Sequence, residues 1–176
     1  MRSDKTQAPP NTPLVEGVDL FCGVGGLSCG LAAEGVRVVA GIDVDPACQF
    51  PYEANHKGAR FLLCDVMTLR AEEVKAFWSP GAVRLLAGCA PCQPFSSYAN
   101  TATVDKAKWR LLREFARLVA ECEPDLVTME NVPRLQQAAP FKDFLRALKR
   151  GKYHVDYAVV NAADYGAPQQ RKRLVL

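Results

Sequence analysis

The sequence predicts an α/β fold built on a Rossmann-like, doubly wound and mostly parallel sheet. Short apolar runs typical of buried strands alternate with longer segments whose apolar residues recur at helical spacing. A glycine-rich turn follows the first of these runs, and acidic residues end the next two. Alternating strands and helices form βαβ units, in which right-handed crossovers lay the strands parallel.

The composition predicts a single soluble domain. A chain of 176 residues with 49% hydrophobic residues can bury one sizeable core, and its polar, proline-containing start predicts a disordered lead-in over 1–13 and one domain over 14–176. Seven cysteines, an odd number, argue against a disulfide framework and for a reducing cytoplasm. The sequence contains no evident signal peptide or membrane span, and a net charge of +3 does not by itself indicate a nucleic-acid partner.

The first half of the domain is predicted to hold four strands and three helices. Gly35 is suited to end the first helix, because glycine readily adopts the left-handed conformation found there. Pro46 suits the first turn of the second helix, where its missing N–H is not needed. The expected strands are 15–21, 36–42, 60–64 and 83–87, and the expected helices are 27–34, 46–55 and 71–78.

The second half begins with a polar segment over 97–105, which is long for a loop in a compact domain. An amphipathic helix is expected next, followed by a strand that ends just before Glu130. The last expected strand is the one in which the chain stops. The expected helices are 106–121 and 141–149, and the expected strands are 125–129, 153–160 and 173–176.

Three strand ends predict a site for an adenosine-containing ligand. The turn with Gly23, Gly25 and Gly26 would let a ligand approach the backbone near a helix N-terminus. Asp43 is placed to accept hydrogen bonds from ribose hydroxyls, and Asp65 could contact an adenine amino group, although a helix N-cap is an equally good interpretation of Asp65. The turn lacks the full G-x-G-x-x-G pattern, so S-adenosylmethionine fits at least as well as NAD.

The stretch Gly88–Ser96 follows an apolar strand and has three possible interpretations. It could be a proline-rich turn around a buried cysteine. Cys89 and Cys92 could form a redox or metal-binding pair. Alternatively, Cys92 alone could be a catalytic nucleophile, presented stiffly between Pro91 and Pro94.

Taken in order, these residues resemble the DNA cytosine-5 methyltransferases, and the match runs from Asp19 to Leu176. The resemblance implies the class I fold of S-adenosylmethionine-dependent methyltransferases and S-adenosylmethionine as the cofactor. The stretches that carry it are Asp19–Leu27, Pro91–Ser96, Glu130–Val132 and Gln169–Arg173, with Asp43 and Asp65 between them.

The resemblance implies a role for each motif residue. The cofactor would be bound by Phe21, Gly23, Gly25, Gly26, Asp43, Val44, Asp65 and Val66. The catalytic residues would be Cys92, Glu130, Arg171 and Arg173. The substrate would be contacted by Pro91, Gln93, Ser96, Asn131, Val132 and Gln169. No metal is expected, and Cys89 becomes a small buried residue, because Cys92 has a role and the sequence has no second cysteine pair.

For such an enzyme the resemblance implies a covalent mechanism. Because C5 of cytosine is a poor nucleophile, the Cys92 thiolate would first add to C6 and create an enamine that takes the methyl group. Glu130 would favour protonation at N3 if it carries a proton when needed, and Arg171 and Arg173 would hold that carboxyl group and the ring oxygen. The base must be flipped out of the duplex, and the 97–105 loop is the expected lid.

The resemblance also implies a substrate and a limit. Double-stranded DNA is the expected substrate, within a restriction-modification or similar system in the cytoplasm or nucleoid. Family members continue into a target-recognition domain that is expected to be absent after Leu176. We therefore expect an unpaired strand edge, an incomplete cofactor pocket and no sequence-specific methylation without a second chain. Two alternatives stay open, a transfer-RNA cytosine-5 methyltransferase and a non-catalytic fragment.

Overall fold

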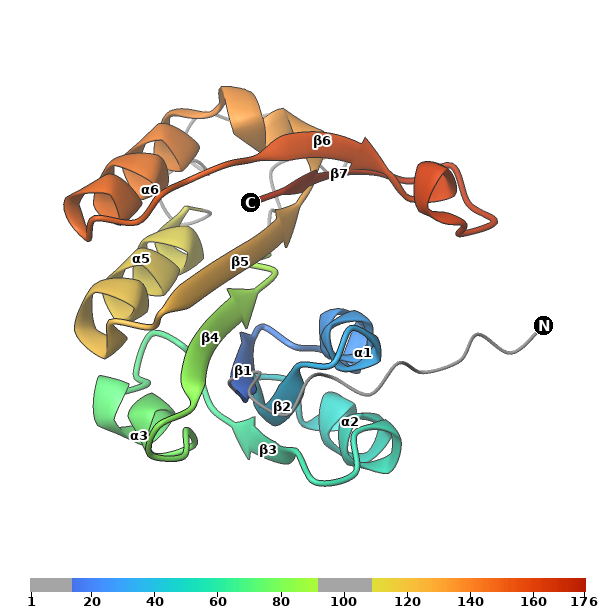
Figure 1. Ribbon diagram of the computed structural model, residues 1–176, viewed down its shortest axis with the longest axis vertical. Coiled ribbons are helices and arrows are strands. Elements are labelled where there is room, and N and C mark those ends of the chain that lie inside the picture. The colour runs from blue at the N-terminus through green and yellow to red at the C-terminus, as the bar shows by residue number, and fades with distance from the viewer. Residues whose placement is uncertain (1–13, 92–108) are drawn as a thin grey trace.

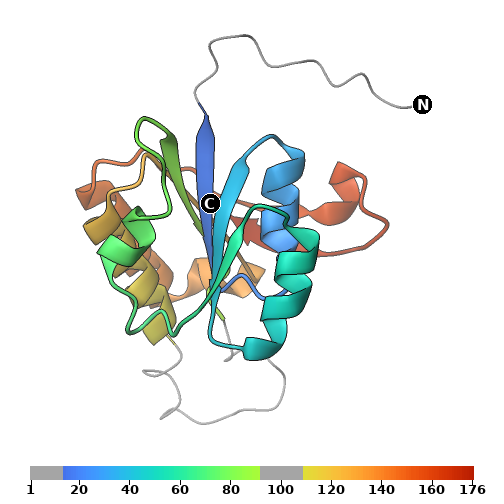
Figure 2. The ribbon, with the colours of Figure 1, turned by 90° about the horizontal axis from the view of Figure 1, so that it is seen from below.

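The computed structural model describes residues 14–91 and 109–176, which form a seven-stranded sheet covered by helices on both faces (Figure 1). Figure 2 shows α1 and α2 on one side of the sheet and α3, α5 and α6 on the other. The predicted α/β fold is therefore confirmed. The strands are β1 (Val15–Leu20), β2 (Arg37–Asp43), β3 (Arg60–Leu63), β4 (Val83–Gly88), β5 (Leu126–Asn131), β6 (Ala158–Asn161) and β7 (Lys172–Val175). The helices are α1 (Gly26–Ala33), α2 (Gln49–Asn55), α3 (Ala71–Lys75), α5 (Arg110–Cys122) and α6 (Ala139–Arg150).

The order of the strands in the sheet is β3-β2-β1-β4-β5-β7-β6, and every strand except β7 runs in the same direction. The expectation that the last strand leaves an unpaired edge is wrong. β7 lies between β5 and β6 and pairs antiparallel with both, and Leu176 exchanges two backbone hydrogen bonds with Met129. The edges of the sheet are instead β3 and β6.

The main core lies between the sheet and the helices α3, α5 and α6. α5 turns Leu112, Phe115 and Leu118 inward at the spacing of a helix face, and all three are buried. Phe115 contacts Phe144 of α6, with the ring centroids 5.3 Å apart. Burial of these apolar side chains supplies the main driving force for packing the helices against the sheet.

On the opposite face, α2 approaches the sheet closely at Gly41 and Tyr52. A Cβ atom on Gly41 would lie 2.2 Å from the Tyr52 ring, so only glycine permits this approach. Tyr52 is fully buried, and its hydroxyl lies 3.0 Å from the Ser28 hydroxyl of α1. This contact connects the packing of α2 to the residues around the glycine turn.

Two predicted strand boundaries are wrong. The strand expected over 153–160 is paired only from Ala158, and Tyr153 instead packs against the core while its hydroxyl donates to the Pro124 carbonyl at 2.5 Å. The alternating apolar residues before Ala158 pack their side chains against the core, although the backbone there pairs with no strand among the described residues. β5 extends through Asn131, so Glu130 lies within the strand and not after it.

Some predictions fall outside the described residues. These are the lead-in over 1–13, the loop over 97–105 and the first residues of the helix expected from 106. Among the helices that the structure describes, none combines the length and the apolar character needed to cross a membrane.

Candidate active site

A pocket of about 480 Å³ opens where β1, β4 and β5 end. Parallel strands end at the same edge of the sheet, so the residues that follow them meet there although they are distant in the sequence. The pocket brings the glycine turn after β1 together with the end of β4, with Glu130 of β5 and with an arginine that precedes β7. It is lined by Phe21, Cys22, Gly26, Leu27, Cys89, Glu130 and Arg171.

Glu130 is held on both of its carboxylate oxygens. Its Oε1 accepts an ion-pair contact from Arg173 Nε at 2.8 Å, and the Arg171 guanidinium lies 3.8 Å from the same oxygen. Its Oε2 accepts a hydrogen bond from the Cys89 thiol at 2.9 Å. The Glu130 side chain is 24% exposed, which leaves it accessible from the pocket. The structure therefore brings together three of the four predicted catalytic residues.

The fourth, Cys92, lies outside the described residues, as do Gln93 and Ser96. The chain that leads to them is held in place, because the Asn131 side-chain amide donates to the Ala90 carbonyl at 2.9 Å. Asn131 is almost fully buried, and its Oδ1 accepts from the backbone N–H of Val132. This amide joins the end of β5 to the start of the nucleophile motif.

The glycine turn and the end of β2 are joined by a second contact. The backbone N–H of Gly23 donates to Asp43 Oδ2 at 2.8 Å, while Oδ1 accepts from the N–H of Asp45. Phe21 has a φ of 58°, a left-handed conformation that costs energy for a residue with a large side chain. Such strain is typical of functional turns, and nothing in the residue type predicts it.

The end of β3 carries the remaining predicted cofactor residues. Asp65 Oδ1 accepts from the N–H of Met67 at 2.9 Å, which is a contact within a turn. The next helix, α3, begins at Ala71 with Arg70 as its N-cap, so Asp65 does not cap a helix. Val66 is buried in the core and offers little surface to a ligand, whereas Val44 is 65% exposed beside the turn. Arg117 of α5 donates to the Val66 carbonyl at 3.2 Å and so anchors this loop.

Asp19, at the end of β1, is a fully buried acid beneath the glycine turn. Its Oδ2 accepts from the Ser28 hydroxyl at 2.7 Å, but its Oδ1 has no hydrogen-bond partner among the residues that the structure describes. Burial raises the pKa of Asp19 to about 6, and the Ser28 hydrogen bond only partly opposes this shift. A buried acceptor without a partner calls for a donor, such as water or a ligand, beyond the described residues.

The glutamine–arginine motif spans an exposed turn and the start of β7. The backbone N–H of Arg171 donates to the Asn161 side chain at 3.0 Å, which ties the motif to the end of β6. Gln169 is exposed and is not among the described residues that line the pocket. Pro91 is also exposed, and Val132 is half-buried after β5. The geometry therefore brings only the two arginines of this motif to Glu130.

Cys89 is the residue whose place the sequence did not indicate. It was expected to be a small buried residue, but it lines the pocket and its thiol contacts Glu130. Burial and the neighbouring carboxylate raise the pKa of Cys89 to about 12, so the thiol keeps its proton and remains a donor. Its place follows from the pairing of β4 with β5, for which the sequence alone holds no signal.

Comparison with known proteins identifies the family. The family model for C-5 cytosine-specific DNA methylases matches residues 15–176. The chain belongs to this family. The Type II methylase M.HgiDII of Herpetosiphon aurantiacus is 46% identical over 162 residues, which cover 90% of this chain and 45% of that protein. The Type II methyltransferase M.AquIA of Picosynechococcus sp. is 30% identical over 175 residues, which cover 90% of this chain and 69% of that protein.

A solved structure gives the same result for the fold of this chain. A prophage-encoded E. coli protein assigned as a DNA modification methyltransferase matches with a TM-score of 0.77 and 31% identity, over 92% of this chain and 45% of that chain. The chain thus spans less than half the length of M.HgiDII and of the E. coli protein. The match confirms the class I methyltransferase fold.

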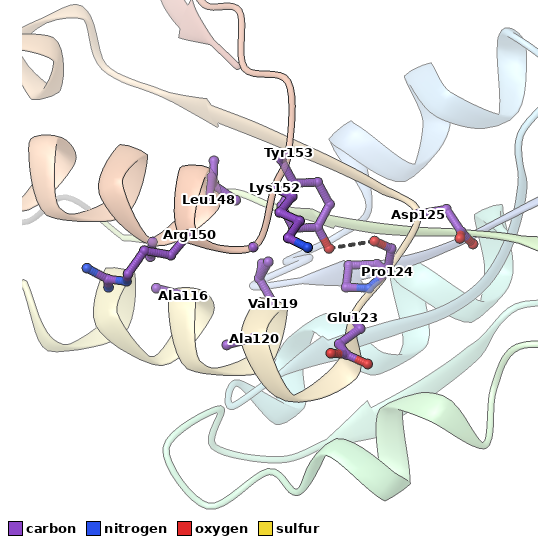
Figure 3. A pocket seen from close by; sticks show the side chains of 12 residues that line it. Ala116, Val119, Ala120, Glu123, Pro124, Asp125, Leu148, Arg150, Lys152 and Tyr153 are labelled. Carbon is purple, nitrogen blue, oxygen red and sulfur yellow. Dashed lines mark hydrogen bonds between the residues drawn. The ribbon is translucent and has the colours of Figure 1, made fainter.

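A second hollow, of about 550 Å³, lies at the other end of β5 (Figure 3). It is bordered by the last turns of α5 and α6, and Figure 3 shows the Tyr153 hydroxyl bonded to the Pro124 carbonyl beside it. Its lining carries charges of both signs, from Glu123 and Asp125 and from Arg150. None of the family motif residues lines it, so the pocket at Glu130 remains the candidate active site although it is smaller.

Proposed function

We propose that this chain carries the catalytic residues of a DNA cytosine-5 methyltransferase, which transfers a methyl group from S-adenosylmethionine to C5 of a flipped-out cytosine in double-stranded DNA. A restriction-modification system is the proposed setting, since the relatives are Type II methylases. The observation that carries the proposal is the ion pair of Glu130 with Arg173: the Glu130 side chain lines one pocket with the glycine turn and Arg171, and its neighbour Asn131 holds the chain just before the nucleophile motif.

The residues around the glycine turn fit S-adenosylmethionine. Asp43 lies beside the turn and has lone pairs left for ribose hydroxyls after its two backbone contacts. The unpartnered Oδ1 of Asp19 is a buried acceptor suited to an ammonium group. Val44 exposes an apolar side chain against which an adenine ring could pack. When bound, the cofactor supplies a methyl group on a sulfonium, which is an electrophile that the enamine carbon can attack.

The protein residues are proposed to act in a fixed order. The Cys92 thiolate forms a bond to C6, and Glu130 directs a proton to N3, so that the electron pair of the C5–C6 bond becomes available at C5. Arg173 holds the Glu130 carboxyl group through this step, and Arg171, which lines the same pocket, would contact the ring oxygen or a phosphate. After methylation a base removes the C5 proton, the C5–C6 double bond re-forms and Cys92 leaves as a thiolate.

A covalent trap tests this proposal. The full chain is incubated with S-adenosylmethionine and a long duplex made with 5-fluorocytosine, which presents many sequence contexts and blocks removal of the C5 substituent. We expect a protein–DNA band on a denaturing gel for the wild type and for Cys29→Ser, an exposed thiol on α1, but not for Cys92→Ser. An equal band with Cys92→Ser would contradict the proposal, and so would the lack of a wild-type band both for the chain alone and after addition of a second chain that carries a target-recognition domain. A band formed only with RNA would favour the transfer-RNA alternative.

A pH dependence tests the cofactor contact. Because the pKa of Asp19 is about 6, its carboxyl group is neutral at lower pH and cannot pair with an ammonium group. We expect the dissociation constant for S-adenosylmethionine to increase about tenfold for each pH unit below that pKa, and to be flat above it. Calorimetric titration across this range measures it.

The Asp19→Asn variant is expected to bind S-adenosylmethionine weakly at every pH, because an amide offers no charge to an ammonium group. Asp164→Asn, at an exposed acid in the β6–β7 connection, is the matched control and should keep the wild-type profile. If Asp19→Asn retains the wild-type affinity or the wild-type pH dependence, Asp19 does not contact the cofactor.

A further inference from the structure

Cys89 lies beside Glu130 because of the way two neighbouring strands pair. In the parallel pair of β4 and β5, Gly88 is opposite Met129, so the next residue on each strand continues the same register. The backbone N–H of Cys89 also donates to the Leu20 carbonyl at 3.3 Å, which fixes the start of the chain after β4. The position of the thiol is therefore set by the sheet and not by a loose loop.

The thiol and the carboxylate form a charge-assisted hydrogen bond. Cys89 Sγ lies 2.9 Å from Glu130 Oε2, which is a close approach for a sulfur donor. Both residues line the pocket, so this contact lies on the surface that a substrate would meet. A thiol that only filled space would have no reason to direct its proton at the carboxylate.

The lone pairs of Glu130 can be counted. A carboxylate offers about four acceptor positions on its two oxygens. Arg173 occupies one on Oε1 and Cys89 occupies one on Oε2, so each oxygen keeps about one position for the pocket. A cytosine edge presents two neighbouring donors to Glu130, which are N3 once it is protonated and the exocyclic amine. The contacts with Arg173 and Cys89 thus fix the carboxyl plane, and with it the direction of the two acceptor positions that remain.

We propose that Cys89 is a positioning residue for Glu130: its thiol holds Oε2 while Arg173 holds Oε1, so that the carboxyl plane faces the cytosine edge. The inference rests on the proposed function for its substrate. Its structural part, the bond between the thiol and the carboxylate, stands on the geometry alone. The competing view is that Cys89 only fills space, in which case any small side chain would serve equally well.

Single-turnover methyl transfer separates the two views. We expect Cys89→Ala to lower the transfer rate about tenfold, the value of one hydrogen bond to a charged group, without changing the KM for DNA or for S-adenosylmethionine. Cys89→Ser keeps a donor at the same place and should recover most of the rate. Cys122→Ala removes a different buried thiol, far from the pocket, and should transfer at the wild-type rate. Equal rates for Cys89→Ala and the wild type would overturn the proposal.

A vibrational measurement tests the bond without any activity. The difference between the infrared spectra of the wild type and Cys89→Ser isolates the S–H stretch of Cys89. We expect this band at lower frequency than the other thiol bands, and we expect it to move to higher frequency in Glu130→Gln, which removes the charge. A band that Glu130→Gln leaves unchanged would overturn the proposal. If the wild type shows this bond but transfers no methyl group, the proposed function fails while the contact stands.

Discussion

Glu130→Gln is expected to lower the rate of methyl transfer by about 10²–10⁴-fold, the usual contribution of a positioned acid–base group. The amide has nearly the same shape and can still accept from Arg173, so the ion-pair geometry is largely kept. It cannot pass a proton to N3 or carry the charge that Arg173 and Cys89 hold in place. Single-turnover transfer of a labelled methyl group to duplex DNA measures the effect.

The same substitution elsewhere on the chain provides the control. Glu123 follows α5 at the opposite end of β5, beside the hollow of Figure 3, and Glu123→Gln should transfer at the wild-type rate. Binding of S-adenosylmethionine should be close to wild type in both variants, because neither residue contacts the glycine turn through a hydrogen bond in the described chain. A Glu130→Gln rate within a few-fold of the wild type would exclude an acid–base role for Glu130.

The fold could be predicted because its signals are local. Apolar runs, a glycine turn and Pro46 mark strands and helices without reference to distant residues, and the observed elements agree with most of the expected ranges. The antiparallel insertion of β7 between β5 and β6 could not be predicted, because strand order depends on packing between distant segments. The strand expected over 153–160 was predicted too long for a related reason. Its alternation is genuine, but no neighbouring strand in the described chain pairs with its residues before Ala158.

The candidate site also has features that the sequence could predict and features that it could not. Glu130, Arg171 and Arg173 could be named from motif residues, and the structure brings them together. The contact of Cys89 with Glu130 spans 41 residues and follows from strand register, which a single sequence does not give. The unpartnered oxygen of Asp19 depends on what surrounds it, so only coordinates reveal it. Residue types thus named Glu130 and its two arginines, while tertiary packing decides how they are held.

The largest effect on stability is expected at Glu16, which lies on β1 far from the pocket. Its side chain is fully buried, and it accepts from the backbone N–H of Ser79 at 2.6 Å, from the Ser79 hydroxyl at 3.0 Å and from Arg37 at 3.1 Å. The Glu16 carbonyl also accepts from the Trp78 indole. Glu16 therefore joins the start of β1 to the segment that enters β4, and these two strands carry the glycine turn and Cys89.

Glu16→Ala is expected to lower the free energy of unfolding by about 2 kcal/mol or more, because it removes a charged acceptor that holds Ser79 and Arg37 and leaves a cavity in place of a fully buried side chain. Urea unfolding at neutral pH measures this, with the slope against urea checked for an unchanged denatured state. Glu34→Ala, at an exposed position after α1, should change the free energy by less than about 0.5 kcal/mol. Similar values for the two variants would mean that solvent or side-chain rearrangement satisfies Ser79 and that β1 does not depend on Glu16. A loss confined to Glu16→Ala would show that the strands carrying the site are held together from their distant ends.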